Sequence, residues 1–457
     1  MANNQTKKRT DYTEGPIIAS ILNMGLPSMF GFLSTNIYSA VDAYWVSRLP
    51  EKEAGVAAIT FFGTLLWFFF SFNQLVGPGS VAVISRRYGE KQYDLAETAI
   101  KETLFLKLLF GFIFGILGYF FVPEMLIVLG ADDMALEMGT VYGRIMFLGM
   151  GIMYATYSIY TAMRGIANPQ MAMILMVASN FLNIVLDPIF MFGYFGMPAW
   201  GIEGAAFASV LSYTLTFGVG LYLFCGDHTT VKLHLKGKIP ISVASMWKLV
   251  KIGIPAWFGS MSYSGARLIM TPLIATFGTG VVAAYGIGNQ VTSFGIMILV
   301  GIGLGLSSLI GHNIGSGKIE RAKKTADHAI VLGVAIMTLM GLATALFARP
   351  IMGIFFDNPD TIQIGVVMLR IFALGFPFMA VLLMIEEIHT GVGMNTPAMI
   401  VNVINAWLLE VVPVVVLTQY YDFPEEVIWW VISGASVVSS TVFYLYYRKG
   451  KWLTAKL

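Results

Sequence analysis

The sequence predicts an all-α integral membrane protein of twelve transmembrane helices, arranged as two pseudo-symmetric six-helix lobes around a central cleft. Of its 457 residues, 57% are hydrophobic and 12% are charged, whereas soluble domains carry about 25% charged residues. About twelve apolar runs reach the roughly 20 residues that a membrane helix needs. The second half of the chain also repeats motifs of the first half. These observations exclude a water-soluble globule.

The apolar runs are separated by short polar loops along the whole chain. Their limits predict helices at about residues 17–48, 56–82, 103–122, 138–163, 168–193, 201–224, 246–276, 280–310, 328–348, 362–390, 396–418 and 425–447. The first run is too long for a cleavable signal peptide and has a counterpart later in the chain, so we expect it to remain as a membrane helix.

The repeat predicts the division into lobes. NMGLPSMFGF at 23–32 matches KIGIPAWFGS at 251–260, which places Pro255 228 residues after Pro27. This offset is half the chain length. Because each half has six helices, both halves enter the membrane from the same side and are related by an axis along the membrane normal. The expected units are an amino-terminal lobe at 1–224, a cytoplasmic linker at 225–245 and a carboxy-terminal lobe at 246–457.

Lys and Arg are concentrated in alternate loops. With the amino terminus placed in the cytoplasm, the inner segments hold 21 Lys and Arg residues, against Arg48, Lys52 and Arg349 in the outer segments. Because positive residues stay on the cytoplasmic side, we predict cytoplasmic termini and a multi-pass protein of the cell inner (plasma) membrane. The net charge of +2 does not indicate a nucleic-acid partner.

Motifs of soluble catalysis are absent from the sequence. Cys225 is the single cysteine, so no internal disulfide can form. The five histidines show no metal-ligand spacing, and GHNIGSGKIE at 311–320 departs from a phosphate-binding loop because Ile319 follows Lys318. We therefore expect a protein that is not an enzyme and needs no cofactor.

Two acids inside the spans are the strongest functional candidates, since a charge within the membrane is costly. Asp42 lies in the first predicted helix and Asp187 in the fifth, each about 9 Å inside the outer boundary. Both helices run outward, so the two carboxylates lie at one depth and can share a cavity. Their membrane burial and mutual repulsion would favour neutralisation by a proton or a hard cation.

Other polar groups reach the same depth. Tyr38 precedes Asp42 by four residues and Asn183 precedes Asp187 by four, which places each pair on one helical face. The complete predicted cation- or proton-binding set is Tyr38, Asp42, Tyr142, Asn180, Asn183, Asp187 and Ser209, with Asp42, Asn183 and Asp187 as ligands if the ion is Na⁺. H⁺ or Na⁺ is the expected coupling ion.

Three residues are candidates for bending or gating. Pro188 leaves the carbonyl of Ile184 without its helical partner and permits a bend beside Asp187. Pro27 and Gly31 offer the equivalent freedom in the first helix. Repacking of that helix after neutralisation of the acids would occur most easily there.

Charged residues elsewhere leave alternatives open. Asp42 and Asp187 could be interfacial, or Arg144 could neutralise them. Their repeat partners are Met270 and about Leu409, so the second half lacks both acids.

Two further pairs of charged residues occur in the second half. Arg267 and Glu410 either form an ion pair or reach the membrane surface separately. Glu386 and Glu387, near the inner end of the tenth helix, are expected to anchor the interface or to act in an inner gate.

Several motifs in order resemble the multidrug and toxic compound extrusion (MATE) family: GLP in the first helix, RGIANP after the fourth, LDP in the fifth and GIEGAAFAS at the start of the sixth. The chain is most similar to a prokaryotic, DinF-like branch with a cation site in the amino-terminal lobe. That pattern is matched by Tyr38, Asp42, Tyr142, Asn183 and Asp187, with Ser209 where a Thr is expected. The resemblance implies export of organic, often cationic or lipophilic small molecules in exchange for H⁺ or Na⁺.

Other functions predict different features on the same architecture. The alternative is a flippase for a lipid-linked or polyprenyl precursor, which requires Arg and Lys in the cavity, whereas mid-span positions here offer few. An integral membrane enzyme would need a nucleophile and base set, and a channel would need a symmetric pore. We expect a monomeric transporter in contact with membrane lipid.

Overall fold

The computed structural model describes residues 11–234, 242–421 and 423–455 and contains helices but no strand in those segments. Ten helices are long and apolar enough to cross a membrane, and a bent pair of helices makes up to eleven. Part of the predicted linker, including Lys236 and Lys238, and the tail residues Lys7, Lys8 and Arg9 lie outside the described residues. The predicted all-helical class is confirmed.

The first half of the chain forms eight α-helices and two short 3₁₀ turns. They are α1 (Ile17–Val46), α2 (Lys52–Ser71), η1 (Phe72–Leu75), α3 (Gly77–Gly89), α4 (Tyr93–Val128), α5 (Asp133–Leu148), α6 (Met150–Gly165), α7 (Pro169–Phe192), η2 (Tyr194–Gly196) and α8 (Ile202–Cys225). The second predicted span is α2, η1 and α3 in succession, and the fourth is the pair α5 and α6, bent by 53°.

The second half forms the remaining helices. They are α9 (Val243–Ala275), α10 (Thr279–Gly315), α11 (Ile319–Leu346), α12 (Ala348–Phe355), α13 (Pro359–Gly391), α14 (Thr396–Val403), the π-helical turn η3 (Ile404–Val411), α15 (Val412–Tyr420), α16 (Glu426–Arg448) and the 3₁₀ turn η4 (Lys451–Thr454). At 33 residues α9 is long enough to span, but Lys248, Lys251 and Arg267 make it more polar than the ten. With α9 and the bent pair, the helices account for all twelve predicted runs.

Side-chain caps explain where several helices begin. Asp132 accepts a hydrogen bond from the Ala135 amide at the start of α5, 2.9 Å long. Asn168 and Ser242 cap α7 and α9 in the same way. Each cap satisfies an amide that has no partner within its own helix.

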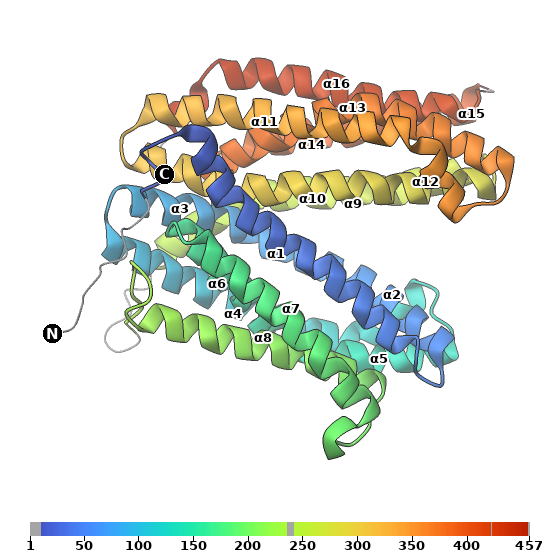
Figure 1. Ribbon diagram of the computed structural model, residues 1–457, viewed down its shortest axis with the longest axis horizontal. Coiled ribbons are helices and arrows are strands. Elements are labelled where there is room, and N and C mark those ends of the chain that lie inside the picture. The colour runs from blue at the N-terminus through green and yellow to red at the C-terminus, as the bar shows by residue number, and fades with distance from the viewer. Residues whose placement is uncertain (1–10, 235–241, 422, 456–457) are drawn as a thin grey trace.

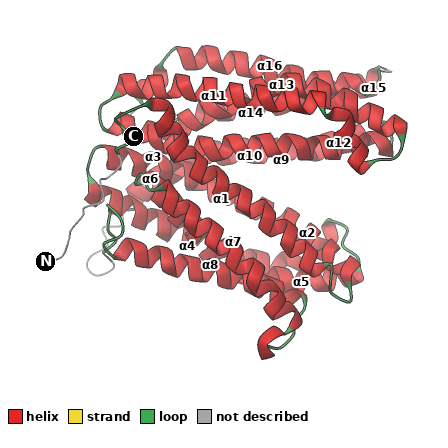
Figure 2. Ribbon diagram, viewed as in Figure 1, coloured by secondary structure: helices red, strands yellow, loops and turns green. Residues whose placement is uncertain are grey.

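The two halves of the chain form two layers of helices, and short loops join successive helices within each layer (Figure 1, Figure 2). One large hydrophobic cluster consists mainly of residues from the second half, whereas a second lies within the first half and a third combines first-half residues with Val231 and Leu233. We call these layers lobe 1 and lobe 2. They approach one another at the end that carries the first and last described residues and diverge toward the end that carries α5 and α12 (Figure 1).

Hydrogen bonds identify the end at which the lobes meet, here called the termini end. Arg86 of α3 donates to the carbonyl of Ala455, 3.0 Å away. The Nε2 atom of His312 in α10 lies 2.7 Å from the carbonyl oxygen of Gly165 in α6, and both residues are buried. Residues of both lobes therefore meet at this end, where Arg86 and the described end of the chain also lie.

Helix α1 belongs to both lobes. Ile21 and Met24 are buried in the cluster of lobe 2, and a Cβ atom at Gly25 would lie 2.9 Å from Ile302 Cα in α10. Farther along, a Cβ atom at Gly31 would lie 3.0 Å from Met176 Sδ in α7 of lobe 1. Asn36 still donates to Met297 Sδ of α10, so α1 is in contact with both lobes over residues 25–36.

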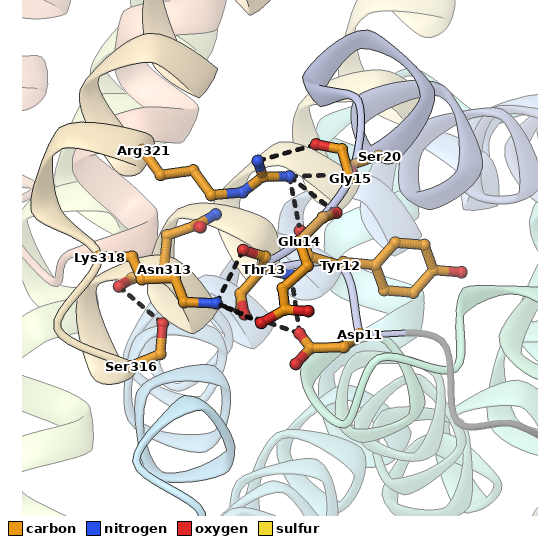
Figure 3. A network of polar contacts seen from close by, with 10 residues as sticks. All are labelled: Asp11, Tyr12, Thr13, Glu14, Gly15, Ser20, Asn313, Ser316, Lys318 and Arg321. Carbon is orange, nitrogen blue, oxygen red and sulfur yellow. Dashed lines mark hydrogen bonds and ion pairs between the residues drawn. The ribbon is translucent and has the colours of Figure 1, made fainter.

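The segment before α1 is fastened to lobe 2 (Figure 3). Lys318 donates to the Thr13 hydroxyl at 2.9 Å and to Glu14 Oε1 at 3.2 Å. Arg321 donates to the carbonyl oxygens of Gly15, at 2.9 Å, and of Glu14, at 3.0 Å. Residues 11–16, here called the strap, thus tie the start of α1 to the beginning of α11.

Candidate functional site

The two predicted acids are both buried in lobe 1. Asp42 is 7% exposed near the end of α1, and Asp187 is 0% exposed near the end of α7. They are near enough to interact electrostatically. Oδ1 of Asp42 and both carboxylate oxygens of Asp187 are buried without a hydrogen-bond partner. Unpaired buried carboxylate oxygens are costly, so the site favours a proton or a cation.

Ser209 links the two helices that carry the acids. Its hydroxyl, in α8, lies 3.2 Å from the Tyr38 hydroxyl in α1. It also accepts a hydrogen bond of 3.0 Å from Asn183 Nδ2 in α7. Asn183 lies close enough to act on the Asp187 carboxylate, and its own Oδ1 is left without a partner. The spacing of four residues therefore places these groups together as predicted.

Tyr142 completes the surroundings of the acids. It is 5% exposed in α5 and lies within electrostatic range of both Asp42 and Asp187. Its ring packs edge-on against Phe62 of α2, with centroids 5.2 Å apart. This packing fixes the ring, so its hydroxyl is held near the acidic pair.

Asn180 has partners that the sequence did not indicate. Its Nδ2 donates to Ser34 Oγ at 2.7 Å and to Thr35 Oγ1 at 3.3 Å, both in α1. Asn180 therefore holds α7 against α1 one helical turn from Asn183, and its contribution to the site is a link between helices.

A polar cavity of about 10 Å³ lies beside these groups, which is about the space that one water molecule needs. It is lined by Tyr38, Ser179, Asn180, Asn183, Ser209, Ser212 and Tyr213. The sequence reasoning missed Ser179, Ser212 and Tyr213. Tyr213 lies four residues after Ser209, so the helical spacing used for the acids would also have identified it.

No side-chain cation neutralises the acids in the part of the chain that the structure describes. Arg144 is exposed, and its guanidinium lies over the Tyr119 ring, 5.4 Å from the centroid. The described residues also contain no group of three or more His, Cys, Asp and Glu that could hold a metal ion. A bound Na⁺ would therefore need Asn, Ser or Tyr oxygens beside the two acids.

Lobe 2 has no equivalent acidic pair. Met270, at the position of Asp42, is buried. Arg267 donates to Asn289 Oδ1 at 3.0 Å and to the hydroxyls of Tyr263 and Tyr285. Glu410 accepts from Asn405 Nδ2 at 2.6 Å. Arg267 and Glu410 interact electrostatically without an ion-pair contact, so the direct pair considered from the sequence does not form.

Charged residues also meet at the termini end. Arg164 of lobe 1 and Glu387 of lobe 2 interact electrostatically. Glu386 accepts a hydrogen bond of 3.3 Å from Asn402 Nδ2. Lys107, 1% exposed in α4, lies within electrostatic range of Arg164. The sequence reasoning missed Lys107, although a lone Lys within an apolar run is the signal that identified the acids.

The three predicted bending residues lie where two helices change their packing. Pro27 lies inside α1, which continues through it without a break. Together with Gly31 it lies where α1 passes from lobe 2 to lobe 1. Pro188 lies inside α7 directly after Asp187, five residues before Gly193, which ends the helix in the left-handed conformation. A change at Asp187 therefore acts beside a weakened part of its helix, whereas Asp42 lies several turns after Pro27 in α1.

The sequence and the fold are similar to those of known transporters. A family model described as MatE matches residues 27–189 and 255–416. The Bacillus subtilis protein "Probable multidrug resistance protein YoeA" is 25% identical over 95% of this chain and 91% of its own length. "Multidrug export protein MepA" of Staphylococcus haemolyticus is 26% identical over 79% of this chain and 78% of its own length.

The fold comparison agrees with the sequence comparisons. A solved structure described as the outward-facing conformation of a multidrug resistance MATE family transporter of the MOP superfamily superimposes with a TM-score of 0.88. It is 23% identical and covers 99% of this chain and 100% of that one. The two segments matched by the family model begin 228 residues apart, which confirms the internal repeat.

Proposed function

The chain belongs to the MATE family, whose members are membrane transporters and not enzymes, and we propose that it is a multidrug efflux antiporter. In this proposal it exports organic, often cationic or lipophilic compounds in exchange for H⁺ or Na⁺ by alternating access. The relatives named for multidrug resistance and export support the substrate class.

The buried acidic pair is the observation that carries the proposal. Asp42 and Asp187 leave three carboxylate oxygens without partners, and their helix neighbours Tyr38 and Asn183 line a small cavity together with Ser209. Two adjacent buried carboxylates repel one another, and a proton or Na⁺ removes part of that charge. The pair is therefore a site whose charge state can drive a change in helix packing.

Helix α1 can transmit that change between the lobes. Asp42 and Tyr38 lie in its lobe 1 part, whereas Met24 lies in its lobe 2 part. If ion and substrate favour different arrangements of α1, each lowers the affinity for the other by the same factor. A membrane potential supplies about 2.3 kcal/mol per elementary charge per 100 mV to the exchange.

The proposed orientation follows from the charges. We place the termini end in the cytoplasm because Arg86, Arg164, Lys318 and Arg321 lie there with both described chain ends. The protein then acts as a monomer in the inner membrane, with its lobes diverging toward the outer side.

Asp42→Asn tests the proposal directly. We expect this variant in sealed vesicles to lose substrate efflux driven by a pH or Na⁺ gradient by at least about tenfold, because the amide cannot be charged and discharged. The efflux rate of a fluorescent substrate is measured with a pH gradient and with a Na⁺ gradient imposed separately. The gradient that drives efflux identifies the coupling ion.

Asp360→Asn is the matched control, since Asp360 is an exposed carboxylate in the first turn of α13. It should leave efflux unchanged. Gradient-driven efflux by Asp42→Asn at the rate of the unaltered protein would exclude the acidic pair as the coupling site.

A further inference from the structure

Buried charged residues of opposite sign lie in the two lobes near the place where the lobes meet. Lobe 1 contributes Arg164 at the end of α6 and Lys107 in α4, which are 3% and 1% exposed. Lobe 2 contributes Glu386 and Glu387 near the end of α13. None of these four residues forms an ion pair within 4 Å among the described residues. Separation of the lobes would therefore separate the Arg164 guanidinium from the Glu387 carboxylate.

Arg164 is buried with little compensation from its own lobe. One guanidinium nitrogen donates to Thr161 Oγ1 at 3.3 Å, but Nε and the other terminal nitrogen have no partner. Across the junction, Glu387 Oε2 is also buried without a partner. Glu387 is thus the main compensation for the Arg164 charge, whereas Ser307 of α10 and then Arg164 stabilise the Glu387 carboxylate.

The repeat explains why these residues meet. RGIANP at 164–169 matches TGVGMNTP at 390–397, an alignment that pairs Thr161 with Glu387. The corresponding helix ends differ in charge, because Arg164 aligns with Thr390 and Glu387 aligns with Thr161. Lobe 1 has the cation and lobe 2 has the carboxylate.

Neighbouring contacts hold the carboxylate in place. A Cβ atom at Gly303 of α10 would lie 2.5 Å from Glu387 Cγ, so the side chain packs closely on that helix. Glu386, the preceding residue, is held by Asn402. His312, also in α10, reaches the carbonyl oxygen of Gly165 beside Arg164. Glu387 is therefore fixed by lobe 2, whereas its charge partner belongs to lobe 1.

We propose that Glu387, assisted by Glu386, is a binding site for the cationic group of a substrate, and that Arg164 occupies this site as an internal counter-ion while the termini end is closed. The inference rests on the proposed export function. When the lobes separate at this end, Arg164 leaves with lobe 1 and the carboxylates remain on lobe 2. Closure returns Arg164 to Glu387 and displaces the bound cation toward the opposite side.

The chemistry of the counter-ion indicates the class of ligand. A guanidinium is flat, delocalised and weakly hydrated, and here it is packed within range of Tyr157 and Tyr160. A flat organic cation shares these properties, whereas a small hydrated ion does not. An anionic substrate would instead bind Lys107 and Arg164 on lobe 1, so the two ligand classes predict opposite effects of the same substitutions.

Equilibrium binding of ethidium, a flat organic cation, to the purified full-length protein tests the proposal. We expect Glu387→Gln to weaken binding by about tenfold, the effect of losing a charge-assisted contact. Arg164→Gln should strengthen binding by at least about threefold, because it removes the competing internal cation. The double variant should bind as weakly as Glu387→Gln, since the counter-ion has no effect once its target is neutral.

Several controls keep the outcome decisive. Asp360→Asn, on the same helix at its other end, should bind ethidium as the unaltered protein does. Nile red, a neutral probe, should bind all variants equally. Should Glu387→Gln fail to fold, Glu387→Asp and Arg164→Gln carry the test. Unchanged ethidium binding in Glu387→Gln, or weaker binding in Arg164→Gln, would overturn the proposal.

Failure of this inference can be distinguished from failure of the proposed function. If Asp42→Asn abolishes gradient-driven efflux but Glu387→Gln binds ethidium normally, the antiporter proposal stands and this site is wrong. If the unaltered protein shows no gradient-driven efflux, the function itself is wrong. In that case stronger binding of an organic anion by Glu387→Gln would point to Lys107 and Arg164 instead.

Discussion

Ser209 is the residue that joins the three helices of the acidic site. Its oxygen lies within hydrogen-bond distance of Tyr38 in α1 and Asn183 in α7. Ser212 lines the same cavity one turn later, but its hydroxyl is buried without a partner. Two serines in one helix therefore differ in whether they connect the helices that carry Asp42 and Asp187.

This difference predicts that replacement by alanine impairs the protein at Ser209 but not at Ser212. Ser209→Ala removes two hydrogen bonds, leaves Asn183 Nδ2 without an acceptor and should cost about 1–3 kcal/mol of site stability. We expect the concentration of coupling ion needed for half-maximal efflux to rise several-fold. Ser212→Ala removes an unpaired hydroxyl and should have little effect, and Ser209→Thr should restore function. Equal effects of the two alanine variants would contradict the arrangement.

Burial also distinguishes two arginines of lobe 1. Arg144 and Arg164 both lie near helix ends, yet Arg144 is exposed over Tyr119 and Arg164 is 3% exposed between the lobes. Position along a helix predicts depth in the membrane, but not which neighbour a long side chain reaches. The uncompensated charges at the termini end were visible only once both lobes were in place.

At the scale of the helices, α1 is the element shared by the two lobes. Its lobe 2 part packs on α10 through glycines, because Gly301 and Gly305 let the backbone of α1 approach where Met29 and Met24 lie. Small residues allow such close approach between membrane helices, where packing replaces the hydrophobic effect. The contact anchors one end of α1 while Asp42 lies at the other.

Matched Gly→Ala substitutions in α10 test this anchor. A Cβ atom at Gly301 would collide with the backbone of Met29, so Gly301→Ala should lower the melting temperature and slow efflux. Gly286, in the same helix, has nothing within 4 Å of an added Cβ atom. Gly286→Ala should therefore be neutral or stabilising by up to about 1 kcal/mol. Thermal unfolding of both variants in detergent measures the two effects. Unchanged stability of Gly301→Ala would contradict the proposed anchor of α1.

The strap is the second element that fixes α1. Burial of Asp11 would raise its pKa, but hydrogen bonds from Thr13 and the charges of Lys318 and Lys91 lower that pKa overall. The stabilisation from an acid with a lowered pKa is present above its unfolded value and is lost as the pH falls through the folded value. The strap should therefore be unaffected by pH in the neutral range.

At the scale of the whole molecule, several of the contacts that hold α1 and the two lobes together lie at the termini end. The strap, the contact of His312 with Gly165 and the crossing of α3 with α10 all lie there. Rocking of the lobes must break these contacts, so their strength sets the balance between the closed and open arrangements.

A cysteine at the junction would report this balance. Cys225, the single native cysteine, is exposed and can be replaced by Ser. Ser85 is 0% exposed and lies against Gly311 of α10, so Ser85→Cys in that background should react slowly with a water-soluble maleimide. Adding Arg321→Ala, which releases the strap, should speed the reaction about tenfold or more.

Lys324, three residues after Arg321 in α11, supplies the control for this labelling measurement. Lys324→Ala, an exposed residue in the same helix as Arg321, should leave the labelling rate unchanged. Mass spectrometry of the modified chain gives the rates. Rapid labelling of Ser85→Cys without any second substitution would show that the termini end is open in solution.

Much of this architecture followed from the sequence because membrane helices are long, apolar and locally determined. The twelve runs, the repeat of 228 residues and the facing of Tyr38 with Asp42 and of Asn183 with Asp187 depend on composition and helical spacing alone. The break of the repeat at Met270 also identified the lobe that carries the acids. The role of these acids in ion binding stays a prediction.

The tertiary structure decided which side chains of different helices contact one another. It assigned Asn180 to Ser34 and Thr35, kept Arg267 apart from Glu410 and placed the start of α1 on lobe 2. It also set Arg164 opposite Glu387. Helical periodicity fixes the face on which a side chain lies, but hydrogen bonds and charge pairs between helices depend on packing distances that no single segment contains.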